Sequence, residues 1–319
     1  MFPFAQTFNP RRINLQVNPN SRKLATQTAV ESKVVILYKS TLQVILVMLT
    51  AISPLFAQTC ERSAAKPESN ASILIARQIM ELSIAATERN WLAWDHYAYI
   101  KLDEDRHLDS LGNLKSEDAD LTKTFLVNGA HFGQLIEHNG HPPSAEERRR
   151  NARDLDKLKR ATPEERTDRL HEEDENRSFL RDVLKAFDFQ LIGEEIAEGR
   201  PAYVLQATPH KGYIAHGKYG KVFPNVEGKF WVDKRDFGWI KVEGNVTRAF
   251  SVGLFLARVQ RGTHIRMVET CVGDDVWVPN RIDIRASATI LFLKNLDIDR
   301  VLTYSDYTRV TDGPYLADR

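Results

Sequence analysis

The spacing of apolar residues changes several times along the chain, and each change indicates a different element. Between Ser72 and Glu88 apolar residues recur every three to four positions, which is the period of a helix that buries one side. The residues on that side are Ile75, Ile79, Leu82 and Ala86. From Trp94 to Leu102 apolar and polar residues alternate, which is the period of a strand. We therefore expect a helix followed by a strand.

Turn residues divide the next stretch into an antiparallel meander. The run from Asp109 to Asn113 is rich in residues that tolerate a left-handed backbone, so it predicts a turn into a second strand that ends near Val127. The pair Asn128-Gly129 is a strong hairpin signal and leads into a third strand, His131 to Glu137.

Residues 144–187 interrupt the strands and carry two helix start signals. Ser144 is followed by Glu147, and Thr162 by Pro163 and Glu165, so each site has the capping-box pattern. Acidic and basic residues balance through most of this segment, which predicts a solvated, salt-bridged helical pair. A mobile lid or docking arm is the alternative.

From Phe189 onward the pattern predicts strands at regular spacing. The expected strands are Phe189–Ala197, Ala202–Thr208, Gly228–Asp233, Trp239–Thr247, Leu254–Gln260, Thr263–Val272, Val276–Ile284, Ala288–Leu293 and Arg300–Val310. The fold class is therefore α+β: one large antiparallel sheet with helices on one side. A sheet of this size tends to curl, so we expect an incomplete barrel with a concave face.

An uncharged, apolar stretch precedes the folded part. It runs from Ser40 to Cys60, follows basic residues and ends in small residues near Ala57, as in a secretory signal peptide. We expect cleavage after Ala57 and a periplasmic protein. The alternative is an uncleaved anchor, residues 40–57, that would tie the chain to the inner membrane.

Composition and charge exclude several classes of function. The net charge is +1, so no global field recruits nucleic acid. The two cysteines, Cys60 and Cys271, are too few for a disulfide framework, although they could form one pair. No nucleophile elbow, zinc-protease, phosphate-loop or dinucleotide motif occurs, so we assign no catalytic residue and no cofactor.

Histidines offer the one pattern typical of a metal site. His131, His138 and His141 lie close together in the sequence, and His210 and His216 share a second loop. Neutral imidazoles bind zinc, but no acidic ligand stands at a characteristic distance from them. A metal-dependent hydrolase therefore ranks last among our hypotheses.

Residues 228–244, GKFWVDKRDFGWIKVEG, resemble the strand-turn-strand of LolA-like half-barrels, the superfamily of periplasmic outer-membrane lipoprotein carriers and related envelope-stress sensor domains. Residues 285–294 and 304–307 are similar to the end of one group of secreted bacterial proteins in that superfamily. The resemblance implies a half-barrel over 72–310 that contains the helical insertion 144–187. We expect a leader and signal peptide at 1–57, a linker at 58–71 and a tail at 311–319. The resemblance also implies binding of a hydrophobic ligand and transfers no site residue.

The leading hypothesis is a non-enzymatic periplasmic binding or carrier protein whose concave face holds a lipid, a lipidated protein or another apolar ligand. The expected lining residues are Trp231, Trp239, Phe250, Leu254 and Phe292. The alternative is an envelope sensor or interaction module that contacts a protein partner through the sheet edges and the helical insertion. Neither hypothesis involves nucleic acid, and the membrane enters only through an uncleaved anchor.

Overall fold

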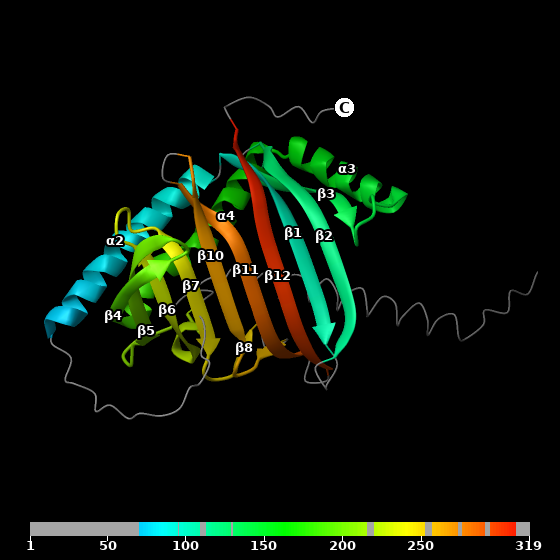
Figure 1. Ribbon diagram of the computed structural model, residues 1–319. Helices are drawn as coiled ribbons and strands as arrows, with labels where there is room; N and C mark the ends of the chain where they lie inside the picture. Colours follow the sequence, from blue (N-terminus) through cyan, green and yellow to red (C-terminus); the bar gives the residue numbers. More distant parts are fainter. Residues whose placement is uncertain are drawn as a thin grey trace, which may run out of the picture. The chain divides into compact units, whose positions relative to one another are not determined.

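A single open antiparallel sheet of twelve strands dominates the described part of the chain (Figure 1). The computed structural model describes residues 70–94, 96–108, 113–128, 130–215, 220–252, 257–273, 276–290 and 294–310. In spatial order the strands are β3 (Ala130–His138), β2 (Leu114–Val127), β1 (Tyr97–Leu108), β12 (Lys294–Arg309), β11 (Val276–Ile290), β10 (His264–Val272), β7 (Trp239–Val246), β6 (Val226–Asp233), β5 (Arg200–Pro209) and β4 (Phe187–Ala197). Two short strands, β8 (Phe250–Val252) and β9 (Ala257–Val259), pair with each other, and β9 also pairs with β11. The predicted α+β class is confirmed.

The hairpins follow the turn chemistry of the sequence. Strands β1, β2 and β3 form the expected meander, and Asn128 has the positive φ of 50° that its turn requires. The pairs β4–β5 and β6–β7 are also hairpins, as predicted. Strand β1 pairs on its other side with β12, so the first and last strands of the described chain lie side by side.

Two expected strands near the end of the chain are one. Strand β11 continues without a break from Val276 to Ile290 where the sequence predicted a gap after Ile284. The alternation continues through the predicted gap, because Ala286 and Ala288 are buried and Arg285 and Ser287 are exposed.

Helix α2 (Asn70–Trp94) confirms the first predicted element but is longer and buries a different side. Ile79 and Ala86 are buried as expected, whereas Ile75 and Leu82 are 46% and 51% exposed. The buried side also includes Ala76, Met80, Ser83, Ile84 and Thr87. The helix is apolar on two sides, so its period alone did not determine which side packs. Its last residue, Trp94, is the first residue of the strand predicted from Trp94 to Leu102, and β1 begins at Tyr97.

Helices α3 (Ala145–Lys159) and α4 (Pro163–Ala186) begin where the capping boxes predict. The amide of Glu147 donates to Ser144 Oγ at 3.3 Å, and the amide of Ser144 donates to Glu147 Oε2 at 2.7 Å. A short 3-10 helix, η1 (Phe223–Asn225), precedes β6 and contacts α4.

The helices do not all lie on one face of the sheet, in contrast to the prediction. Leu155 and Leu158 of α3 pack against Ala98, Phe125 and Phe132. Tyr99, the next residue after Ala98, contacts Trp94 of α2 instead, with ring centroids 5.9 Å apart. Successive side chains of a strand point to opposite faces, so α3 and the end of α2 lie on opposite faces. Figure 1 shows α3 beside β3, at the end of the sheet away from β4.

Candidate ligand-binding face

Helix α2 contacts both β4 and β11, so it crosses the four strands between them on one face of the sheet. We call this the covered face. Strand register carries one row of residues across it: Leu191, Leu205, Phe230, Val242, Met267, Ile282 and Leu302, on seven neighbouring strands. All of these residues except Leu191, on the edge strand, are buried. The covered face is therefore apolar from β4 to β12.

The same row becomes polar where it continues onto β1, β2 and β3. Leu302 pairs with Asp103, Asp103 with Asp120, and Asp120 with His138. Arg300 binds both carboxylate oxygens of Asp103 at 2.6 Å. The hydrogen bond between His138 Nδ1 and Asp120 Oδ1, 2.7 Å long, raises the pKa of His138. The covered face thus has a long apolar part and a charged end.

The opposite face, which we call the open face, has the reverse character. The next row in register is Gln190, Gln206, Lys229, Glu243, Arg266, Asp283, Val301, Glu104 and Ala119. Arg266 lies between two carboxylates in this row, 3.5 Å from Glu243 and 3.9 Å from Asp283. A surface of paired charges is typical of a solvated face.

Trp239 is the predicted lining residue that lies on the covered face. Its ring centroid is 5.3 Å from that of Phe230, and Phe230 is 6.3 Å from Phe189. Trp239 is 2% exposed, and none of the described residues provides a hydrogen-bond partner for its indole Nε1. Ser83, on the buried side of α2, is fully buried, and its Oγ also has no partner within the described part of the chain. Buried polar atoms of proteins are rarely left without a partner.

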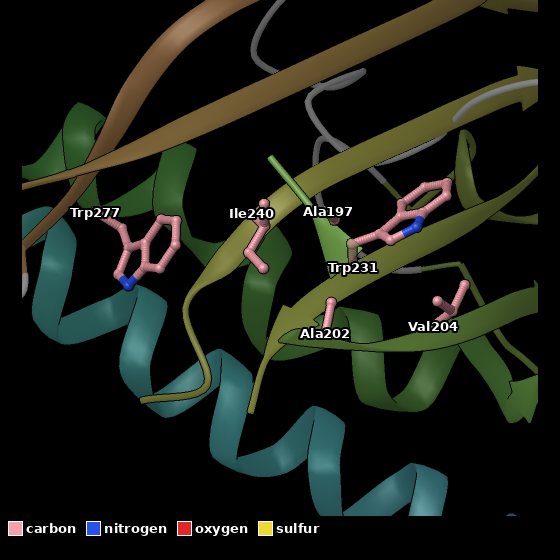
Figure 2. Close-up of a cluster of buried hydrophobic side chains, with 6 residues drawn as sticks. All are labelled: Ala197, Ala202, Val204, Trp231, Ile240 and Trp277. Atoms are coloured by element: carbon pink, nitrogen blue, oxygen red, sulfur yellow. The ribbon is translucent and has the colours of Figure 1, made fainter. Parts of the chain in front are cut away.

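Trp231 lies on the open face, so the structure does not bring the two predicted tryptophans together. It is adjacent to Phe230 in β6 and therefore points the other way. Its Nε1 donates to Glu195, and Lys241 Nζ lies 3.6 Å from the ring centroid. Figure 2 shows Trp231 in a cluster whose members are Ala197, Ala202, Val204, Trp231, Ile240 and Trp277. These six side chains pack among themselves, which makes Trp231 a structural residue.

The remaining predicted lining residues stand apart from this arrangement. Phe250 is partly exposed and belongs to β8, which pairs only with β9 among the described residues. Leu254 and Phe292 lie outside the described residues, as do the predicted signal peptide and Cys60. Cys271 is partly buried and packs beside the Trp231 cluster.

Several residues of the stretch 228–244, which resembles the LolA-like half-barrels, stabilise the turn between β6 and β7. Asp233 Oδ1 accepts hydrogen bonds from the amides of Arg235 and Asp236, and Arg200 donates to Asp233 Oδ2 at 2.5 Å. Burial opposes ionisation of Asp233, but these hydrogen bonds outweigh it and lower the pKa of Asp233. Gly238 packs so closely on Trp277 that a Cβ atom would lie 2.1 Å from the indole nitrogen. The centre of the stretch therefore fixes the β6–β7 turn, whereas Phe230 and Trp239 on its two strands lie on the covered face.

The histidines do not gather into one site, although His138 and His141 pair through their backbones. His131 stacks near Trp94 at 5.9 Å, and His210 pairs with Asp188 at 2.8 Å in another part of the sheet. Among the described residues, no three or more His, Cys, Asp or Glu side chains come close enough to hold a metal ion. His216 lies outside those residues.

A desolvated carboxyl group gave no signal in the sequence. Burial raises the pKa of Glu269, on β10, to about 8. Burial also raises the pKa of Tyr307, and the charge interaction with Tyr304 raises it further. The Tyr307 hydroxyl donates to the Pro279 carbonyl at 2.5 Å. Tyr99 joins them, 5.4 Å from Tyr307 and 5.8 Å from Tyr304. These residues come from three separate strands, so no local spacing predicts the cluster.

Comparison with known proteins gives structural matches alone. No protein-family model and no curated protein matches the chain. Solved structures that match include an outer-membrane lipoprotein-sorting protein domain from Vibrio parahaemolyticus, so described, at 11% identity and a TM-score of 0.34, over 74% of this chain and 95% of that one. A LolA superfamily protein from Nitrosomonas europaea matches at 12% identity and a TM-score of 0.26, over 75% and 94%. The MucA/MucB complex of Pseudomonas aeruginosa matches at 10% identity and a TM-score of 0.22, over 72% and 99%.

One of these structures is described as a LolA superfamily protein, and residues 228–244 resemble that superfamily. With TM-scores this low they carry no argument about function, which has to come from the two faces of the sheet. None of the described helices is long and apolar enough to span a bilayer.

Proposed function

We propose that this chain is an exported, non-enzymatic binding protein that holds an apolar ligand, a lipid or a lipidated protein, between α2 and the covered face. One observation carries the proposal: a row of seven apolar residues crosses seven strands, and a single helix spans six of them, from β4 to β11. The open face has paired charges in its central row, and its apolar residues are gathered in the Trp231 cluster, whose side chains pack among themselves.

The ligand would take the place of contacts that α2 makes with the sheet. Trp239 and Ser83 are closed off from solvent, so the helix has to move away before a chain can reach them. Three large apolar side chains, Ile79, Met80 and Ile84, hold α2 down, at roughly 1.5 to 3 kcal/mol each. An acyl chain that buries about ten methylenes gains roughly 8 kcal/mol, which is similar in size. The exchange is therefore close to balanced and reversible.

Two polar contacts between α2 and α4 lie at the surface. Arg77 donates to the Leu184 carbonyl at 3.3 Å, and Glu88 lies 3.9 Å from Arg181. Both ties join α2 to α4, and exposed ion pairs contribute little to stability. These two contacts would re-form when the helix returns to the sheet, and they add little to the cost of moving it away.

Purification with organic extraction tests the proposal. The protein is isolated from the periplasm, extracted, and the extract analysed by mass spectrometry for bound lipid. A parallel sample is titrated with a fluorescent fatty-acyl probe. We expect a co-purified lipid or saturable probe binding. A protein that is free of lipid and also ignores the probe contradicts the proposal.

A second function is favoured by a different observation. Large apolar side chains are exposed along the outer side of α2, namely Ile73, Leu74, Ile75, Leu82 and Leu92. Such a surface suits contact with an envelope protein. Crosslinking and pull-down from envelope fractions test this role. A stoichiometric partner lost in the Leu74→Ser, Leu82→Ser double variant, or on deletion of 144–181, supports it. Unchanged capture by both variants contradicts it.

Export itself is part of the proposal. The expected cleavage after Ala57 would release the chain into the periplasm, and an intact segment 40–57 would keep it at the inner membrane. Cell fractionation with N-terminal sequencing of the recovered protein separates the two outcomes. A cytoplasmic protein that retains its leader contradicts both.

A further inference from the structure

The indole N–H of Trp239 is a buried donor for which the described residues provide no acceptor. The residue is 2% exposed, and no described side chain or carbonyl accepts from its Nε1. Phe230 packs on its ring from the neighbouring strand. A buried N–H without an acceptor costs free energy, so the group needs a partner that the described chain does not supply.

Two other buried tryptophans, which have a packing role, do have acceptors for their indole N–H groups. Trp231 lies on the next strand, and its Nε1 donates to the Glu195 carboxylate. Trp277 likewise donates to Asp236 Oδ1 at 2.9 Å. Both of these tryptophans belong to the cluster in Figure 2. Trp239 differs from them in its face and in its lack of an acceptor.

A second donor stands on the helix that closes over this face. The Ser83 hydroxyl has no partner in the described ranges, although the carbonyl of the same residue accepts from Thr87 Oγ1 at 3.0 Å. Ser83 is fully buried on the sheet-facing side of α2. Among the described residues, α2 also carries a second such donor, Trp94 Nε1 at its end, so both surfaces that would separate to admit a ligand present unused hydroxyl or N–H groups.

Resting on the proposed function above, we infer that the ligand is an acyl compound whose carbonyl oxygen accepts a hydrogen bond from Trp239 Nε1. A plain hydrocarbon would fill the apolar row but leave the indole N–H without a partner. An ester or amide carbonyl at the head of an acyl chain satisfies it. The site thus distinguishes acyl esters and amides from alkanes of the same length.

The test uses the purified exported chain and two competitors of matched length, methyl palmitate and heptadecane. Each competitor displaces the same fluorescent fatty-acyl probe, and the ratio of their displacement constants is measured. We expect wild-type protein to prefer the ester by about three- to tenfold, the size of one hydrogen bond. Trp239→Phe should abolish the preference and retain alkane binding. Trp231→Phe, the matched control on the open face, should keep the preference.

The outcomes separate this inference from the function on which it rests. If neither competitor displaces the probe and the probe itself does not bind, the proposed function fails. If both competitors bind equally well to wild-type protein, or if Trp239→Phe keeps the ester preference, the function stands and the inference fails. The wild-type ratio alone decides the matter should Trp239→Phe not fold, which thermal unfolding reports.

Two acyl sources share this chemistry, and a second arm separates them. Dipalmitoylglycerol and an N-palmitoyl peptide replace methyl palmitate in the same displacement assay. A loss of affinity in Trp239→Phe is expected for the source that the site holds. No loss with either source overturns the inference.

Discussion

The two faces of the sheet are built from alternate residues of the same strands, yet they differ in almost every chemical respect. The row through Phe230 on the covered face is apolar across seven strands, whereas the row through Lys229 on the open face is mostly polar and charged. The two tryptophans of residues 228–244 make the same contrast, since Trp231 has an acceptor and Trp239 has none. The apolar surface under α2 is thus also the place where the indole N–H of Trp239 lacks an acceptor among the described residues.

The largest expected difference between the two faces is the loss of stability when a cavity is made on the covered face. Phe230 is 1% exposed and packs on Trp239 and Phe189. Phe230→Ala should lower the free energy of unfolding by about 3 to 5 kcal/mol. Urea unfolding followed by circular dichroism measures the change.

The matched control is the neighbouring residue on the open face. Lys229→Ala should change the free energy of unfolding by less than about 0.5 kcal/mol. Equal costs for the two variants would break the distinction between the faces.

Helix α2 allows the same comparison within one element. Met80→Ala removes a fully buried side chain and should cost about 2 to 5 kcal/mol. Leu82→Ala, on the 51% exposed outer side, should cost less than about 0.5 kcal/mol. The measurement is again urea unfolding. A larger cost at Leu82 would mean that α2 packs on the side that the sequence period first indicated.

A smaller effect depends on pH. Burial raises the folded-state pKa of Glu269 to about 8, above its ordinary value near 4.3 in an unfolded chain. The folded protein therefore favours the neutral acid, and this stabilisation is complete below about pH 4 and is lost as the pH rises through about 8. Glu269→Gln, which stays neutral, should be more stable than wild type at pH 8 and similar to it at pH 4. Thermal unfolding at both pH values checks this, and a constant difference between the proteins would contradict it.

Local features of the fold were predictable because local chemistry controls them. Capping boxes at Ser144 and Thr162 start α3 and α4, and the Asn128 turn joins β2 to β3. The α+β class followed from the number and spacing of the strands. The buried side of α2 was not predictable, since apolar residues on two sides compete and tertiary packing selects one of them.

The lining residues were harder to predict than the strands that carry them. Trp231 and Trp239 both stand in strands with strong patterns, but their faces depend on register through a turn. A register shift between Trp231 and Val232 places Ile240 as an extra residue in β7, so counting from one tryptophan does not give the face of the other. The missing hydrogen-bond partners of Trp239 and Ser83 depend on tertiary packing and have no sequence signal.

The central claim is that an acyl chain binds on the covered face, and bromine quenching tests it most directly. Wild type, Trp239→Phe and Trp231→Phe are titrated with dibrominated palmitate while tryptophan fluorescence is recorded. The account predicts that the quenched component disappears in Trp239→Phe and persists in Trp231→Phe. Quenching that is absent in all three proteins, or that survives in Trp239→Phe and is lost in Trp231→Phe, would contradict it.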